Sequence, residues 1–112
     1  MARIELGKEG EKLAIDYLLT KGYKILEKNF RTPFGEIDII AKDGNFIVII
    51  EVKRRLSDKF GKPELSVNYT KQQKLKKLAL YYISMLKKEY PVRFDVIAIN
   101  DKKIEHIENA FF

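Results

Sequence analysis

Cysteine is absent from this sequence of 112 residues, and histidine occurs only once, at His106. Without cysteine the chain can form no disulfide, no thiolate metal site and no cysteine nucleophile. With one histidine it can build no two-histidine metal centre, and we expect His106 to be structural. The lack of cysteine also fits a reducing compartment, so we expect a cytoplasmic protein.

Long hydrophobic runs are missing as well. The first five residues lack the apolar stretch of a signal peptide, and the most apolar segment, residues 46–50, is far too short to cross a bilayer. Repeats, low-complexity tracts and linkers rich in proline or glycine are also absent. We therefore expect one soluble domain over residues 1–112, with no membrane partner.

Positive charge, by contrast, is in excess. Lysine and arginine number 22 against 16 for aspartate and glutamate, which gives a net charge of +6 and a pI near 9.4. A basic domain attracts polyanions, and nucleic acid is the commonest polyanion inside cells. Because lysine can also serve solubility alone, the charge favours a nucleic-acid partner without establishing one.

The pattern of apolar residues predicts an alternation of helices and strands. Helices are expected at residues 6–21 and 71–89, and strands at 23–30, 36–41, 46–53, 92–100 and 103–108, with a turn at 33–35 and a loop at 54–68. We expect Thr70 to cap the second helix, with Gln73 completing a capping box, and Pro91 to end it. The order α-β-β-β-α-β-β predicts an α/β domain with one central mixed sheet flanked by helices.

The two central strands form the strongest local signal, because Asp43-Gly44-Asn45 between them is typical of a hairpin turn. With Gly44-Asn45 as the loop, Asp38 faces Glu51 and Glu36 faces Lys53. Since side chains alternate between faces, one face of the hairpin is apolar, with Ile37, Ile39, Ala41, Val48, Ile50 and Val52. The other face carries Glu36, Asp38, Glu51 and Lys53. A loop at Asp43-Gly44 keeps these faces, whereas a three-residue loop breaks them unless a bulge restores the parity.

Two opposed acids on a hairpin need a cation between them. Directly opposed like charges are destabilising. Lys53 supplies one positive charge to offset the repulsion between Asp38 and Glu51, and a divalent metal is the other solution. Mg²⁺ favours oxygen ligands, often one or two carboxylates together with water and phosphate. Such an ion could bind a phosphate and lower the pKa of a bound water. The alternative is that Glu51-Val52-Lys53 is an ordinary charged stretch on a solvated sheet face.

Several short motifs along nearly the whole chain resemble those of one nuclease family. They are Gly10-Glu11 with Ala14, Gly22-Tyr23 with Ile25-Leu26, Asn29-Phe30-Arg31, Gly35-Glu36-Ile37-Asp38-Ile39-Ile40-Ala41, Glu51-Val52-Lys53-Arg54-Arg55, Phe60-Gly61 and Arg93-Phe94-Asp95-Val96-Ile97. Together they resemble the PD-(D/E)xK nuclease superfamily, whose core is an Asp, a strand and then Glu/Asp-x-Lys. The match is closer still to the YraN-like bacterial proteins, which are similar to archaeal Holliday-junction resolvases.

The resemblance implies a restriction-endonuclease-like fold and a catalytic set of Asp38, Glu51 and Lys53. It implies that Asp38 and Glu51 bind Mg²⁺ or Mn²⁺ and that Lys53 is the catalytic lysine. In resolvase-like relatives a glutamate on the first helix also approaches the metal, and Glu11 occupies that place here. The proline of the family pattern is replaced by Ile37, at a position that varies in the superfamily.

Other charged and aromatic residues are secondary candidates. Glu11 could equally be a surface glutamate near the positive end of its helix, and Glu36 could support Lys53 or merely end an exposed strand. The cations expected to contact phosphates are Arg54, Arg55, Lys71 and Lys74, although a solvated charged face is the commoner fate of such a run. Tyr69, Tyr81 and Phe60 could stack on bases, but core or rim packing is more usual. Asp95, in an apolar strand, could anchor a turn or a basic side chain.

The sequence therefore predicts a metal-dependent endonuclease that hydrolyses phosphodiester bonds in branched or structured DNA. The first alternative is an inactive nucleic-acid-binding module that keeps the nuclease fold, and the second is a protein-interaction domain. A homodimer would suit a junction substrate, because junction resolvases work as symmetric pairs.

Overall fold

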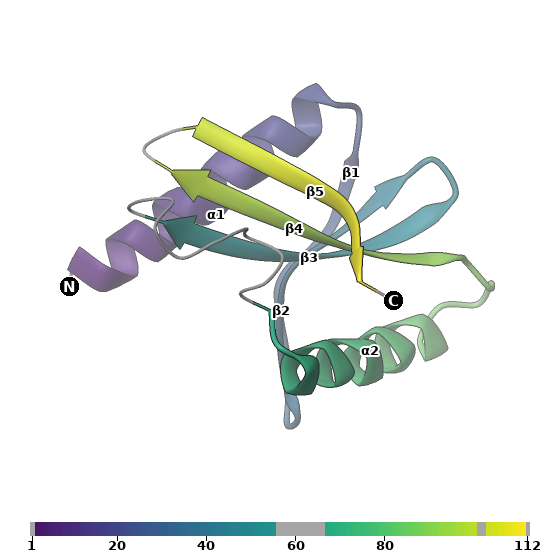
Figure 1. The fold of residues 1–112 in the computed structure, drawn as a ribbon. Coiled ribbons are helices and arrows are strands. Elements are labelled where there is room, and N and C mark those ends of the chain that lie inside the picture. Colours follow the sequence, from purple (N-terminus) through teal and green to yellow (C-terminus); the bar gives the residue numbers. More distant parts are fainter. Residues whose placement is uncertain (1, 56–66, 101–102, 112) are drawn as a thin grey trace.

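The computed structural model describes residues 2–55, 67–100 and 103–111, and for residues 2–8 and 55 it describes the backbone alone. The elements are α1 (Ala2–Thr20), β1 (Lys24–Thr32), β2 (Gly35–Asp43), β3 (Phe46–Arg55), α2 (Tyr69–Ser84), β4 (Val92–Asn100) and β5 (Lys103–Phe111) (Figure 1). This order confirms the predicted α/β class and agrees with a restriction-endonuclease-like fold. Neither helix in the described ranges is long and apolar enough to cross a membrane.

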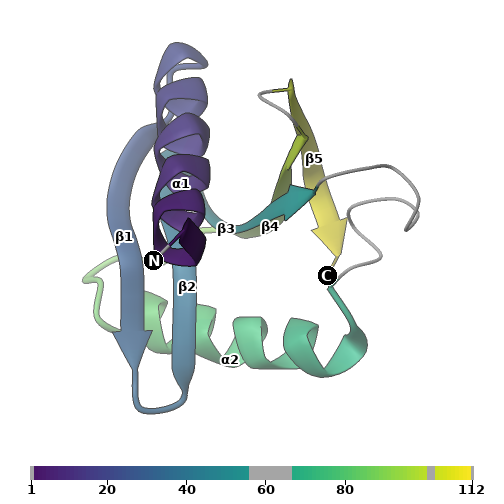
Figure 2. The same ribbon diagram turned by 90° about the vertical axis from the view of Figure 1, so that its left-hand side faces the viewer.

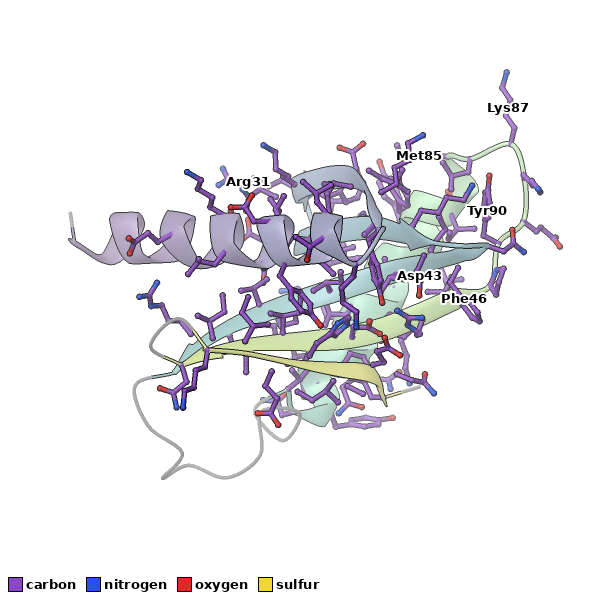
Figure 3. The ribbon with its side chains drawn as sticks, turned by 90° about the horizontal axis from the view of Figure 1, so that it is seen from above. Arg31, Asp43, Phe46, Met85, Lys87 and Tyr90 are labelled. Carbon is purple, nitrogen blue, oxygen red and sulfur yellow. The ribbon has the colours of Figure 1, made fainter. Side chains whose placement is uncertain are left out.

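All five strands form one mixed sheet in the order β1-β2-β3-β4-β5. The pair β3–β4 is parallel and the other neighbours are antiparallel. In the β2–β3 hairpin Asp43 pairs with Phe46, which confirms Gly44-Asn45 as the loop; these two side chains lie at the turn in Figure 3. Gly44 has a φ of 57°, a left-handed conformation that favours glycine at such a turn.

The two helices cover opposite faces of this sheet (Figure 2). One buried cluster lies under α1 and is made of Ala14, Leu18, Tyr23, Ile39, Ala41, Val48, Ile50, Ile97 and Ile99. The other lies under α2 and is made of Ile37, Ile40, Ile47, Ile49, Val67, Leu75, Leu78, Ala79, Tyr82, Phe94, Val96 and Phe111. Because both faces are covered, β2, β3 and β4 read as nearly continuous runs of Ile and Val.

The second helix differs from the prediction at both ends. Its N-cap is Asn68, whose side chain accepts a hydrogen bond from the backbone N–H of Lys71 at 2.9 Å, so the predicted cap at Thr70 was wrong. Asparagine is the better cap because its short carbonyl reaches that amide. The helix ends at Ser84, before Pro91, because the amides of Met85 and Leu86 bond to carbonyls three residues back and tighten the last turn.

The strands β3 and β5 both run further than expected. Arg54 and Arg55, predicted to open a loop, continue β3 because the parallel ladder pairs them with Ile99 and Asn100 of β4. Most of the predicted loop at 54–68, including Phe60, lies outside the described residues. The last strand extends to Phe111 because Phe111 pairs with Phe94 and packs into the cluster under α2.

Candidate active site

The β2–β3 hairpin opens at Asp38, and this opening positions the site. The backbone ladder between β2 and β3 runs from Asp43↔Phe46 to Ile39↔Ile50. At the next step the carboxylate of Asp38 accepts a hydrogen bond from the backbone N–H of Val52 at 2.9 Å. The Asp38 carboxylate thus accepts the hydrogen bond of an amide at the point where the backbone ladder stops, and this bond holds the carboxylate against β3.

This opening also corrects the predicted apolar face. Five of its six members pack toward α1, but Ile37 belongs to the cluster under α2, together with Ile40. The strict alternation along β2 therefore fails between Ile37 and Ile39. The hairpin rule placed Ile37 wrongly because it assumes a regular ladder through Asp38.

Asp38 and Glu51 open into the same pocket on the α2 side of the sheet. The pocket has a volume of about 240 Å³ and is lined by Gly35, Glu36, Asp38, Glu51, Lys71, Lys74, Leu75 and Leu78. Its acids come from β2 and β3, while its lysines and leucines come from α2. The structure therefore brings together two residues that lie thirteen positions apart in the chain, on one side of the sheet, as the sequence predicts.

Glu51 is buried in this pocket, with only 6% of its surface exposed. Two lysines neutralise it. The ammonium of Lys71 on α2 donates a hydrogen bond to Glu51 Oε1, and Lys53 Nζ lies 3.5 Å from the same oxygen. The predicted proximity of Glu51 and Lys53 on one face is thus present. Lys71, expected from the sequence only to contact phosphates, instead lies against the acid itself.

The electrostatics of the pocket keep Asp38 close to protonation near neutral pH. Burial, together with the negative charge of Glu51, raises the pKa of the Asp38 carboxyl from 3.8 to about 6, although the hydrogen bond from the Val52 amide opposes both effects. Burial by itself would lower the pKa of Lys71, but the hydrogen bond to Glu51 and the charge of that carboxylate raise it above its ordinary value. At Asp38, burial and the charge of Glu51 thus outweigh the opposing effects of the Val52 amide and of Lys71.

Glu11 lies close to this pocket but does not line it. Its carboxylate accepts a hydrogen bond from the amide of Asn29 at 3.0 Å, and it borders a separate hollow of about 350 Å³ between α1 and β1. Its charge nevertheless contributes to the raised pKa of Asp38. Among the residues that the structure describes, no group of three or more acids or histidines could hold a metal ion. Asp38 and Glu51 therefore form a two-carboxylate arrangement.

The remaining predicted residues have different surroundings. Glu36 lines the pocket, but its exposed carboxylate pairs with Arg31 at 3.2 Å rather than supporting Lys53. Arg54 forms an ion pair with Glu9 of α1 at 3.7 Å, which places it on the opposite face from Lys53. The side chain of Arg55 lies outside the described residues. Lys74 is exposed and lies over Gly35 at the pocket rim.

A second buried acid, Asp95 of β4, lies under α1 and is fully hydrogen-bonded. It accepts hydrogen bonds from Arg93 through both oxygens at 3.0 Å, from the backbone N–H of Asn109 at 3.0 Å, and pairs with His106 at 2.7 Å. Although burial would raise the pKa of Asp95, the hydrogen bonds from His106 and Arg93 hold it below its ordinary value. This confirms Asp95 as an anchor for a basic side chain and for the irregular end of β5, and it gives His106 the structural position expected.

The fold and the pocket define a class: an α/β protein with a restriction-endonuclease-like arrangement and a pair of carboxylates beside two lysines. Comparison with known proteins names the family. The profile of "Uncharacterised protein family UPF0102" matches residues 10–99. A UPF0102 protein of Persephonella marina is 50% identical over 108 residues, which cover 94% of this chain and 91% of the relative. One of Clostridioides difficile strain 630 is 51% identical over 110 residues, or 96% of each chain.

The chain therefore belongs to the UPF0102 family. This confirms the kinship with YraN-like proteins that the short motifs predict. A UPF0102 protein of Syntrophus aciditrophicus, 48% identical over 113 residues, covers 96% of this chain and extends the match along nearly its whole length. These names state a family and no activity, so the activity is inferred from the residues of the pocket.

Proposed function

We propose that this protein is a metal-dependent endonuclease that hydrolyses phosphodiester bonds in branched or structured DNA. The observation that supports this most is that Asp38 and Glu51 lie in one pocket, where burial, together with the negative charge of Glu51, raises the pKa of Asp38 to about 6. A buried pair of acids is costly unless a cation joins it. The proposed cation is Mg²⁺ or Mn²⁺.

The donor set of the pocket suits such an ion. Both ligands are carboxylates, and Mg²⁺ commonly uses one or two carboxylates and completes its shell with water and phosphate oxygens. Two carboxylates are therefore sufficient, and Glu11 could join only through a side-chain movement that releases Asn29. When bound, the ion would supply positive charge to the phosphate and lower the pKa of a coordinated water.

The lysines of the pocket would act on the substrate. Lys53 lies 3.5 Å from Glu51, at the end of β3 where a phosphate or an attacking water would lie. Lys71, which donates to Glu51 in this structure, would bind a phosphate oxygen of the substrate. Preorganised cations around a reacting phosphate contribute by stabilising the charge that develops in the transition state. Lys74 at the rim would hold a neighbouring phosphate.

An inactive nucleic-acid-binding module is the second candidate, and the ion pair between Lys71 and Glu51 favours it. In that case Lys71 permanently supplies the cation that the acid needs, and the pocket holds no metal. The positive net charge of +6 then serves binding alone. The proposed setting in both cases is the cytoplasm, and a homodimer would provide two such pockets for a junction.

Cleavage assays on labelled junction, flap, single-stranded and duplex DNA test the proposal. We expect cleavage that needs Mg²⁺ or Mn²⁺ and that falls by about 100-fold or more in Asp38→Asn, Glu51→Gln and Lys53→Ala. Glu36→Gln is the matched control, because Glu36 lines the same pocket but pairs with Arg31. Equal cutting by wild type and all variants would overturn the proposal, since it would indicate a contaminating nuclease.

A further inference from the structure

A larger groove continues from the acidic pocket between α2 and the β1–β2 turn. It has a volume of about 750 Å³ and is lined by Phe34, Tyr69, Thr70, Gln73, Lys74, Lys77, Leu78 and Tyr81. Phe34 belongs to the turn between β1 and β2, and its neighbour Gly35 lies close to Lys74 and Leu78 of α2. The tip of this turn projects just beyond α2 in Figures 1 and 2. Lys74 and Leu78 line both hollows, so the groove leads directly into the proposed active site.

Three aromatic rings in this groove are exposed. Tyr69 is 73% exposed, Phe34 is 70% exposed and Tyr81 is 47% exposed. Tyr81 also contacts Phe30, with ring centroids 6.3 Å apart, whereas Phe34 and Tyr69 expose most of their surface. A scattered exposed aromatic needs no explanation, but a group of them around one hollow marks a binding surface. Tyr81 has a rim contact, as the sequence predicts, whereas Tyr69 is exposed over most of its surface.

The charge of the groove indicates what the rings bind. Among the residues that the structure describes, its lining includes Lys74 and Lys77 and no acidic side chain. A second copy of this chain docked here through a two-fold axis would bring these lysines toward those of its partner, because such an interface uses the same patch twice. Like charges brought together in that way oppose association. Aromatic rings interleaved with lysines instead suit a strand whose bases stack and whose phosphates are negative.

We propose that this groove binds an unpaired segment of the nucleic-acid substrate. Bases of that segment stack on Phe34, Tyr69 and Tyr81, and its phosphates lie along Lys77 and Lys74 toward Asp38 and Glu51. Stacking on a ring needs a base whose face is free, which a paired base inside a duplex cannot offer. The substrate class is therefore DNA with a single-stranded arm beside the point of cleavage. This inference rests on the proposed function for the position of the reacting phosphate.

Fluorescence anisotropy in the presence of a chelator tests the groove apart from catalysis. The probes are a labelled single-stranded oligonucleotide, a flap with a single-stranded arm, and a blunt duplex of the same length. We expect wild type to bind the first two more tightly than the duplex, and Phe34→Ala and Tyr69→Ala each to weaken that binding by about tenfold. Tyr69→Phe keeps the ring and should retain binding.

Matched controls lie on the same helix and just beyond it. Leu80→Ala removes a side chain that is 70% exposed on α2 but does not line the groove. Lys87→Ala removes a lysine that extends away from the molecule in Figure 3, for comparison with Lys77→Ala. Both controls should bind like wild type, and Lys77→Ala should also flatten the salt dependence of binding. Thermal melting checks that every variant is folded.

The outcomes separate the groove from the catalytic proposal. Preference for single strands that is lost in Phe34→Ala and Tyr69→Ala supports the inference even if no cleavage is ever detected. Equal binding of the three probes, unchanged by those variants, overturns it even if the flap is cleaved. A dimer that dissociates in Phe34→Ala and Tyr69→Ala without any change in oligonucleotide binding would overturn it too, and would assign the groove to a second copy.

Discussion

Two acids, Asp38 and Asp95, lie on opposite faces of the same sheet and are treated in opposite ways. Asp95 accepts four hydrogen bonds, and its pKa is lowered. Asp38 accepts one hydrogen bond from Val52, faces the charge of Glu51, and has a pKa raised to about 6. The hydrogen bonds of Asp95 therefore stabilise the fold. The raised pKa of Asp38 supports the ligand-binding role proposed for it, because perturbed carboxylates gather at functional sites.

The largest effect is expected at Asp95. Asp95→Asn should lower the free energy of unfolding by about 3 kcal/mol, because it removes the buried charge that pairs with the largely buried guanidinium of Arg93. Urea titration of the far-UV circular dichroism signal measures this change. Asp43→Asn is the matched control, because the more exposed Asp43 meets only one end of Arg93 and should cost clearly less. An unchanged free energy of unfolding in Asp95→Asn would show that Asp95 does not stabilise the fold.

The same substitution at Asp38 should have the opposite sign. Since the folded-state pKa lies above the ordinary value of 3.8, the ionised carboxylate destabilises the folded protein above about pH 6. This destabilisation disappears as the pH falls, because the folded protein binds the proton more tightly than the unfolded chain. Asp38→Asn should therefore raise the free energy of unfolding by about 2 kcal/mol at pH 8.

That gain should nearly vanish at pH 4, where the wild-type carboxyl is already protonated in the folded state. Paired urea titrations of wild type and Asp38→Asn at the two pH values provide the measurement. A gain of the same size at both pH values would show that the amide improves packing or hydrogen bonding. It would then say nothing about the charge that Asp38 shares with Glu51.

A smaller effect is expected at Lys71. Its substitution distinguishes a permanent ion pair with Glu51 from a site that binds a metal. Lys71→Met removes the cation that donates to Glu51, and should lower the free energy of unfolding by about 1 kcal/mol in a chelator, since Lys71 is partly exposed. Millimolar Mn²⁺ should restore that loss, because the metal takes the place of the ammonium beside Glu51. Thermal melts with a chelator and with Mn²⁺ provide the measurement. Lys74→Met, on the rim of the same pocket, is the control. A loss that Mn²⁺ leaves unchanged would favour the inactive module.

The smallest effect is expected at the pair of Arg31 and Glu36. Both side chains are exposed and 3.2 Å apart, so Glu36→Gln should change the free energy of unfolding by about 0.3 kcal/mol or less. A change above about 1 kcal/mol that depends on Mn²⁺ would contradict the account, because Glu36 would then belong to the acid pair rather than to the rim of the pocket.

Much of this fold follows from local rules in the sequence. The turn at Gly44-Asn45 and the runs of Ile and Val in β2, β3 and β4 give the hairpin, its register and the order of elements. Helix ends were less predictable, because Asn68 and Thr70 are both good caps and only the packing of α2 decides between them. The placing of Ile37 was missed because the ladder opens at Asp38, and a regular alternation cannot anticipate that opening.

The candidate site was predictable where it depends on the hairpin and not where it depends on α2. Asp38, Glu51 and Lys53 follow from strand pairing, whereas the contact of Lys71 with Glu51 joins two elements whose relative position no short-range pattern sets. The same holds for the groove, since Phe34 and Tyr69 lie far apart in the sequence and meet only because the β1–β2 turn lies beside α2.

Calorimetric titration of Mn²⁺ into the folded protein tests most directly whether Asp38 and Glu51 bind a divalent metal. We predict one ion bound by each wild-type chain, and no binding by Asp38→Asn or Glu51→Gln, while Glu36→Gln binds as wild type does. Binding of the ion with the same affinity by Asp38→Asn and Glu51→Gln, or no binding by the wild type, would contradict the account.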